Sequence, residues 1–506
     1  MKLNGKKIGF VLGIFLFVLF IALPVPQGMN VEAWRLAAVT ILMAVFWVTE
    51  ALPVPATALL PIVFYPIFGI MRSPAVTASY GDNIIYLFLG GFFLAATMEK
   101  WNLHRRIALN IIRLTGTTPS KMVLGFFAAT LLLSMFVSNT ACAVMMVPIA
   151  IAVAKSLTGK ASDPASVKKE SNFSKSLLLT VAYASTIGGI TTIIATPANG
   201  IAVSILRETY GLNVTFVQWM MIGVPLALVM SAFVWFMLTK VLFRTGDLKL
   251  LGGREVIEEE LQKLGKMTAP EKRVLFVAGL MVFCWITRGL LQNIERVREA
   301  LPILDMLTDT QISIGGTILM FLIPAKNEKK DERLLDWPTA VKIPWGICLL
   351  FGGGIAIARA FDVTGLASWI SGNLASINGL TLFTAVLIST AVVCCLTEIT
   401  SNTAIASLFI PIMGATAIAL GVHPFATVMA ICFSSSMCFA MPVATPPNAI
   451  AYSSGYIKIK DMAYAGLILN FVTIIMVFST IMWLLPLIWG VDLTVTPQSV
   501  LDFMAH

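Results

Sequence analysis

A stretch of 95 residues, Val363–Ile457, contains one charged side chain, that of Glu398. Two further runs, Leu212–Thr239 and Met462–Val491, contain none, and each exceeds the roughly 20 residues that cross a bilayer as a helix. Only 12% of all residues are charged, against about 25% in soluble globular proteins. The sequence therefore excludes a water-soluble enzyme and a disordered chain, and it predicts an all-α polytopic membrane protein.

One apolar run is too long for a single crossing. Met122–Ala154 has 33 residues without a charge, and Ser138-Asn139-Thr140 lies near its centre. A helix of that length would reach about 50 Å, whereas the hydrocarbon core of a bilayer is about 30 Å thick. We therefore expect a re-entrant hairpin over 122–154. A second one is expected over about 380–420, where Ser401-Asn402-Thr403 repeats the tripeptide.

The basic residues set the predicted orientation, because Lys and Arg are enriched in cytoplasmic loops. With the N-terminus in the cytoplasm, 28 of the 35 Lys and Arg residues fall on the cytoplasmic side and the remaining 7 on the outer side. This split predicts a multi-pass plasma-membrane protein with about eleven transmembrane helices and the two hairpins. The spans are expected at Ile8–Pro24, Leu36–Thr49, Val54–Met71, Ile84–Met98, Leu177–Leu206, Gln218–Thr239, Val274–Thr287, Thr310–Ala325, Ile343–Ala358, within 423–457, and at Met462–Gly490.

The segments between the spans have their own patterns. Trp101–Leu114 and, more weakly, Gly365–Ile377 show the amphipathic spacing of helices that lie in the membrane interface. The cytoplasmic loop 240–273 is predicted to hold a solvated helix, and a charged loop is expected around Gly159–Ser174. All seven cysteines lie in apolar runs and predict neither a disulfide framework nor a metal site.

The chain contains an internal repeat. An offset of 263 residues places Ser138-Asn139-Thr140 on Ser401-Asn402-Thr403, and an offset of 249 places Thr196-Pro197-Ala198-Asn199 on Thr445-Pro446-Pro447-Asn448. The Thr-Pro motifs predict broken helices within 177–206 and 423–457. Because the two predicted hairpins open to opposite sides, the copies are inverted repeats, which many secondary transporters have.

The repeated residues suit helices that begin inside the membrane. Ser, Asn and Thr are N-cap residues, and proline favours the first helical position. A hairpin tip or a broken helix leaves backbone groups that protein, water or an ion must satisfy. Helix N-termini favour an anion, and hydroxyl, amide and carbonyl oxygens suit a small hard cation such as sodium. Two similar half-sites match a substrate with a charged group at each end, such as a C4 dicarboxylate.

The paired Ser-Asn-Thr tripeptides, each followed by a Thr-Pro break, resemble the divalent anion:sodium symporter family of INDY-type sodium-dicarboxylate cotransporters. The most specific matches are Leu396–Thr403 and Pro442–Asn448, and the similarity covers nearly the whole chain. The resemblance implies a homodimer in a lipid bilayer that works as an elevator. Scaffold segments 1–121 and 274–358 would stay fixed, and a transport domain of 122–239 and 359–491 would carry sodium with a substrate of succinate, malate or fumarate type. Residues 492–506 form the C-terminal tail.

The resemblance also implies binding residues. One sodium ion would be held by Ser134, Ser138, Asn139 and the carbonyl of Ala195, and a second by Thr397, Thr400, Asn402 and the carbonyl of Ala444. The substrate would contact both hairpin tips and both breaks, through Asn139, Thr140, Thr196, Pro197, Asn402, Thr403, Thr445 and Pro446. Ala195 and Ala198 depart from the family pattern, in which glycine and proline are frequent at these positions.

Other functions stay open at this point. The alternatives are a sulfate or tricarboxylate carrier, or a sodium-independent dicarboxylate exchanger, of the same fold. An exchanger or a carrier of a bulkier anion would be expected to place Arg or Lys beside a hairpin tip, where this chain has none. A membrane enzyme is disfavoured, because no histidine pairs with a nucleophile and a carboxylate inside the repeats. A proton-coupled carrier needs an ionisable group in its pathway, and Glu398, the single candidate, has a simpler role in supporting its hairpin. No nucleic-acid partner is expected, because the basic residues lie between the spans.

Overall fold

The computed structural model describes residues 5–116, 118–157, 163–244, 253–292, 294, 297, 306–326, 331–375 and 381–505. Regular structure in this part of the chain is helical, apart from one β-bridge between Pro324 and Arg333. Nine of the described helical segments are long and apolar enough to cross a membrane. The prediction of an all-α polytopic membrane protein is therefore confirmed.

The helices follow one another with short connections. In the first half they are α1 (Gly5–Ala22), α2 (Val31–Thr49), α3 (Val54–Thr57), α4 (Leu60–Ile67), α5 (Ser73–Ala78), α6 (Asn83–Lys100), α7 (Leu103–Thr115), α8 (Pro119–Ser134), α9 (Asn139–Leu157), α10 (Pro164–Gly188), α11 (Pro197–Tyr210) and α12 (Phe216–Phe236). In the second half they are α13 (Gly253–Leu264), α14 (Ala269–Leu291), α17 (Asp309–Leu322), α18 (Trp337–Ala340), α19 (Trp345–Val363), α20 (Leu366–Ala375), α21 (Leu382–Leu396), α22 (Asn402–Ala419), α23 (Pro424–Ser436), α24 (Pro446–Ser453), α25 (Ile459–Ser479), α26 (Leu485–Trp489) and α27 (Gln498–Ala505).

Two segments differ from the sequence prediction. The expected span Val54–Met71 is divided into α3 and α4, because its closely spaced prolines lack the N–H that a continuous helix requires. The charged loop expected around Gly159–Ser174 is helical from Pro164 onward, where proline starts α10; Gly159 itself lies outside the described residues. The C-terminal tail contains α27. The interfacial segment expected up to Ile377 is helical as α20, and residues 376–380 lie outside the described residues.

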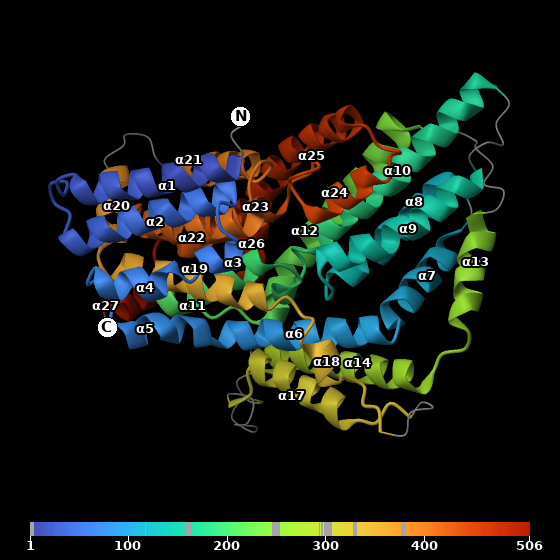
Figure 1. Ribbon diagram of the computed structural model, residues 1–506, viewed down its shortest axis with the longest axis horizontal. Helices are drawn as coiled ribbons and strands as arrows, with labels where there is room; N and C mark the ends of the chain where they lie inside the picture. Colours follow the sequence, from blue (N-terminus) through green and yellow to red (C-terminus); the bar gives the residue numbers. More distant parts are fainter. Residues whose placement is uncertain are drawn as a thin grey trace.

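Two helical hairpins pack in the same way in the two halves. The first, α8 and α9, lies against α10, and the second, α21 and α22, lies against α23. The preceding helix differs between the halves, because α7 packs on the first arm of its hairpin, α8, whereas α20 packs on the second arm, α22. Figure 1 shows α13 at one end of the long axis of the molecule, and α20 and the C-terminus at the other end.

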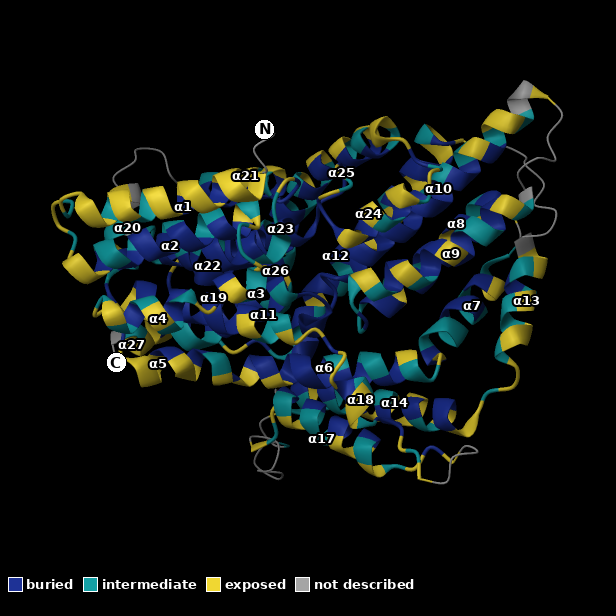
Figure 2. Ribbon diagram, viewed as in Figure 1, coloured by how far each residue is buried: buried dark blue, intermediate teal, exposed yellow. Residues whose placement is uncertain are grey.

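Burial separates an outer from an inner set of helices. Only Gly9 and Gly13 are buried on α1, whereas every residue of α23 is buried. Figure 2 shows this contrast between the exposed α1 and the buried centre of the molecule. An apolar helix with exposed side chains is typical of a surface that faces lipid.

An ion-pair network connects three helices near the ends of α6, α11 and α19. Asp82 caps α6 by accepting the Ile84 N–H at 2.9 Å, and it accepts the Arg207 guanidinium of α11 at 2.9 and 3.1 Å. The neighbouring Glu208 accepts Arg359 of α19 at 2.6 Å. We refer to Asp82, Arg207, Glu208 and Arg359 as the α6–α11–α19 network. It joins a first-half broken helix to two helices that lie outside the hairpins.

Candidate functional site

Both tripeptides lie at the tips of the hairpins. The first return helix, α9, begins at Asn139, and the second, α22, begins at Asn402 with Ser401 as its N-cap. The Ser138 hydroxyl accepts the N–H of Ala141 at 3.3 Å. Each hairpin therefore directs the free N–H groups at the start of its second helix toward the tip.

Both Thr-Pro motifs begin a helix after a break. Between α10 and α11 the chain leaves the α-helical conformation for residues 189–196, and between α23 and α24 it does so for residues 437–445. Thr196 and Thr445 are the N-caps of α11 and α24. The Thr445 hydroxyl accepts the Asn448 N–H at 3.2 Å, whereas the Thr196 hydroxyl is buried without a hydrogen-bond partner among the described residues.

A neighbouring helix comes very close to each break. A Cβ on Gly223 of α12 would lie 2.5 Å from the carbonyl oxygen of Ile190, and one on Gly466 of α25 would lie 2.2 Å from Cα of Ala440. These distances leave no room for a larger residue. Glycine at both positions thus lets α12 and α25 support the two non-helical segments.

Oxygen atoms converge behind the first tip. The Ser134 hydroxyl lies 2.7 Å from the side-chain oxygen of Asn139 and 2.7 Å from the carbonyl oxygen of Ser185. The Ser134 hydroxyl has one proton, so it donates to only one of these two oxygens at a time. A small hard cation, in contrast, is coordinated by several neutral oxygens at once.

The second tip repeats this arrangement. The Thr397 hydroxyl lies 2.7 Å from the side-chain oxygen of Asn402 and 2.7 Å from the carbonyl oxygen of Ser435. The Thr400 hydroxyl, in the turn after α21, donates to the carbonyl oxygen of Leu396 at 2.7 Å. Two oxygen clusters of the same composition therefore lie at equivalent places in the two repeats.

One cavity of about 730 Å³ brings the tips and breaks together. All eight predicted substrate residues line it, as do Ser138, Ala195, Thr400 and Ala444 of the predicted sodium sites. Ser134 and Thr397 are fully buried and lie outside its lining. Glu50 is the one described lining residue with a charge, and it is paired with Lys6 at 3.3 Å. The cavity therefore presents helix N-termini and neutral oxygens, without Lys or Arg in its described lining.

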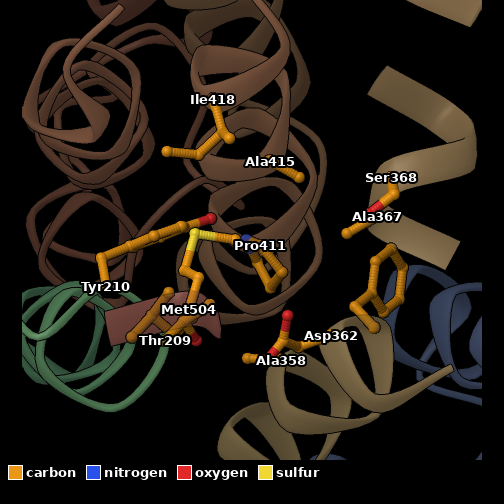
Figure 3. Close-up of a pocket in the computed structure, with 12 residues that line it drawn as sticks. Thr209, Tyr210, Ala358, Asp362, Ala367, Ser368, Pro411, Ala415, Ile418 and Met504 are labelled. Atoms are coloured by element: carbon orange, nitrogen blue, oxygen red, sulfur yellow. The ribbon is translucent and has the colours of Figure 1, made fainter. Parts of the chain in front are cut away.

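Two other cavities differ from this one. A cavity of about 630 Å³, which contains Lys100, His104 and Lys342, shares Ser138 and Thr140 with it. A small cavity of about 40 Å³ lies between α11, α19, α20, α22 and α27, where Figure 3 shows Tyr210 and Met504 together. This small cavity shares no lining residue with the one at the hairpin tips.

Glu398 supports the second break from the second hairpin. Its carboxylate accepts the backbone N–H groups of Phe439, Ala440 and Met441 at 2.7 to 3.1 Å, and the Asn470 amide at 2.7 Å. All four donors lie in the second break or on α25. The carboxylate therefore fixes residues just before Ala444, one of the predicted sodium ligands.

The family of the chain follows from a comparison with known families. Residues 5–490 match the family described as the sodium:sulfate symporter transmembrane region. The chain belongs to the divalent anion:sodium symporter family. This symporter is 39% identical to the sodium-dependent dicarboxylate transporter SdcS of Staphylococcus saprophyticus over 490 residues, which are 97% of this chain and 93% of the relative. It is 41% identical to SdcS of Staphylococcus aureus strain NCTC 8325 over 493 residues, with the same coverage.

Two solved transporter structures have a similar fold. The YdaH transporter of Alcanivorax borkumensis matches with a TM-score of 0.54 at 11% identity, over 95% of this chain and 96% of that one. MtrF of Neisseria gonorrhoeae matches with a TM-score of 0.51 at 9% identity, over 96% of this chain and 95% of that one. At these identities the likeness supports the fold alone.

Several residues around the symporter's cavity could not be found from the motifs. Trp47, Glu50 and Ile347 line it from α2, the turn after α2 and α19, far from either tripeptide in the sequence. Ser436, the last residue of α23, and Cys438, in the second break, lie beside the second tip. A weak signal was present for these two, because polar residues interrupt an apolar run just before Pro442.

Proposed function

We propose that this protein is a secondary active transporter that couples the movement of sodium to that of C4-type dicarboxylates. The observation that carries the proposal is the pair of equivalent oxygen clusters beside one cavity, at distances of 2.7 Å in both repeats. The SdcS relatives, which are named sodium-dependent dicarboxylate transporters, support the same substrate and ion.

Charge balance explains why sodium would be needed. A dianion in the cavity meets no basic side chain among the described lining residues, and helix N-termini supply partial charges only. Two sodium ions, one at each oxygen cluster, would neutralise it. Substrate binding and sodium binding must then strengthen each other, because linkage is reciprocal.

The residues divide into two roles in this proposal. Sodium would bind at Ser134, Ser138, Asn139 and the carbonyl of Ala195, and at Thr397, Thr400, Asn402 and the carbonyl of Ala444. The two carboxylates would be held at the tips and breaks, by Asn139, Thr140, Thr196, Pro197, Asn402, Thr403, Thr445 and Pro446. Helix N-termini at both tips would face the substrate's two ends.

An elevator movement in a homodimer would complete the cycle. The moving part would comprise 122–239 and 359–491, in which α10 packs on α8, α9 and α24. The scaffold would comprise 1–121 and 274–358, and the loop 240–273 would lie in the cytoplasm together with the N-terminus. The distribution of Lys and Arg supports this orientation in the plasma membrane, with 28 of 35 on the cytoplasmic side.

The test is succinate binding to the purified protein, titrated with sodium chloride against choline chloride. We expect tight binding in sodium only, competition by malate and fumarate, and poor competition by monocarboxylates of similar size. Equal succinate affinity in both salts would refute the coupling. Strong inhibition by sulfate with none by succinate would instead assign the protein to sulfate transport, as the family description also allows.

Variants separate the two proposed roles. Asn139→Ala and Asn402→Ala should impair transport and weaken the apparent sodium affinity, since each removes an oxygen from a cluster. Thr140→Ala and Thr403→Ala should chiefly raise the succinate concentration needed for half-maximal transport. Asn172→Ala, whose amide donates to the carbonyl oxygen of Arg244 far from the tips, is the matched control.

A further inference from the structure

The two half-sites differ in one position beside the asparagine. In the first, Gly189 lies so close to Asn139 that a Cβ would be 2.7 Å from the amide nitrogen and 2.6 Å from the Thr196 methyl group. The residue 249 positions later, at the offset that aligns the two Thr-Pro motifs, is Cys438. The first half-site therefore has no space for a side chain where the second carries a thiol.

The thiol contacts two of the predicted ligands of the second sodium ion. Cys438 is fully buried, and its sulfur lies 3.4 Å from the side-chain oxygen of Asn402 and 3.8 Å from the carbonyl oxygen of Ala444. A thiol is a weak donor and a soft, poor ligand for sodium. It occupies space between two hard oxygens without adding a third.

A second side chain near this site, that of Ser436 at the end of α23, has a hydroxyl group without a hydrogen-bond partner among the described residues. Ser436 is 3% exposed and lines the cavity. Leaving a buried hydroxyl unpaired is costly. By contrast, Ser434 on the same helix donates to the carbonyl oxygen of Ala430 at 2.6 Å. Ser436 is therefore available to a bound ion or carboxylate.

We propose that Ser436 and Cys438 belong to the second half-site, where the Ser436 hydroxyl adds a ligand and the Cys438 thiol limits how closely Asn402 and Ala444 approach the ion. The proposal rests on the proposed function, because it specifies the sodium site at the second hairpin. It places a thiol beside Asn402 and Ala444 in the second ion site, where the first has Gly189 and carries its own thiol, Cys142, beside Ser134. The two sodium sites should then differ in their affinity and in their preference between sodium and lithium.

Two conservative substitutions test this, each with a matched control. Cys438→Ser exchanges the soft sulfur for a hard oxygen and should tighten the apparent sodium affinity in the succinate-binding assay by about two- to tenfold, the size of one hydrogen bond. Ser436→Ala should weaken it by a similar factor. Cys432→Ser is the control for the first, because the Cys432 sulfur also lies 3.4 Å from an asparagine side-chain oxygen, that of Asn199. Ser434→Ala is the control for the second.

Lithium provides a second measurement on the same variants. Cys438→Ser should raise succinate binding in lithium chloride relative to sodium chloride, because a shorter hydroxyl side chain allows a smaller ion closer contact with hard oxygens. Neither control should alter the ratio. Succinate affinity at saturating sodium should stay within twofold in the two control variants.

Thiol protection gives a readout that does not depend on substrate. In a chain with Cys438 as its only cysteine, modification by methyl methanethiosulfonate without succinate should be slower in sodium than in choline. Absence of sodium-dependent succinate binding in the natural protein would overturn the proposed function itself. If sodium-dependent succinate binding is present, two results would overturn only the assignment of Ser436 and Cys438. The first is an equal rate of Cys438 modification in sodium and in choline. The second is a sodium dependence of succinate binding in Cys438→Ser and Ser436→Ala that matches that of their controls.

Discussion

Replacing Glu398 by glutamine should loosen the second break and weaken sodium binding there. The carboxylate is 7% exposed and uses both oxygens as acceptors, one for Phe439 and Asn470, the other for Met441, with Ala440 shared between them. Glutamine keeps one acceptor oxygen and turns an NH2 group toward N–H donors. At least one N–H, that of the part-buried bond of Met441 or that of the buried Phe439, then lacks an acceptor.

The magnitude follows from that loss. A buried donor left unpaired costs about 1–3 kcal/mol, which corresponds to a factor of about 5–150 in an equilibrium. The cost falls on the folded geometry of residues 437–445, the segment that contains the carbonyl of Ala444. We therefore expect Glu398→Gln to lower the thermal unfolding temperature in detergent and to raise the sodium concentration for half-maximal succinate binding by about fivefold or more.

The assay compares three proteins side by side. Thermal unfolding and sodium-titrated succinate binding are measured for the natural protein, Glu398→Gln and Glu259→Gln. Glu259 is exposed on α13, so its variant should behave as the natural protein does. If Glu398→Gln retains both the unfolding temperature and the sodium affinity, the hydrogen bonds of the carboxylate do not hold the ion site in shape. A shift of sodium affinity with pH that disappears in Glu398→Gln would instead show that the residue carries a proton.

Three further predictions concern topology, the α6–α11–α19 network and pH. In a cysteine-free background, Lys168→Cys and Asn213→Cys should react with an impermeant thiol reagent from opposite sides of the membrane, and labelling from one side would contradict the inverted repeats. Asp82→Asn weakens the 2.9 and 3.1 Å ion pair with Arg207, which joins the proposed scaffold to the proposed moving part. Spin labels on Thr77 and Ser453 should then show a change of up to about fivefold in the ratio of two distance populations, since a partly exposed ion pair is worth about 0–1 kcal/mol. Asp82→Glu keeps the charge and is the control, and an unchanged distribution would exclude a role in conformational balance. Burial lowers the pKa of His423, the N-cap of α23, to about 4, although the nearby Asp492 raises it in part. Below about pH 6.5 the unfolded chain therefore binds a proton at His423 that the folded protein does not bind. The stability of the folded protein should fall as the pH drops from about 6.5 to about 4. His423→Asn keeps a capping oxygen and should flatten that pH dependence of the unfolding temperature, and an unaltered slope would assign it to another group.

Local rules were enough to predict the tips and breaks from the sequence. Asn139 and Asn402 begin their return helices because polar N-cap residues interrupt long apolar runs, and Pro197 and Pro446 begin theirs because proline suits the first helical position. The internal repeat strengthened both predictions, since each motif occurs twice in order.

Contacts between distant segments could not be predicted in this way. The partners of Glu398 lie 41 to 72 residues away in the sequence, and the sulfur of Cys438 meets Asn402 across 36 residues. Nothing in the composition of α2 places Trp47 beside the hairpin tips. Hydrophobic periodicity reports which face of a helix is apolar, but not which helix covers it.

The position of Glu398 also has an electrical consequence. Its four donors lie in the second break and on α25, so the carboxylate belongs to the part of the chain proposed to move. Shifting one elementary charge through the full membrane potential changes the energy by about 2.3 kcal/mol per 100 mV. With two sodium ions cancelling a dianion, the Glu398 carboxylate would add the same charge to the loaded and the empty form, which move in opposite directions. Through this carboxylate, membrane voltage would bias which way the protein faces at rest, while contributing nothing to the net work of a complete cycle.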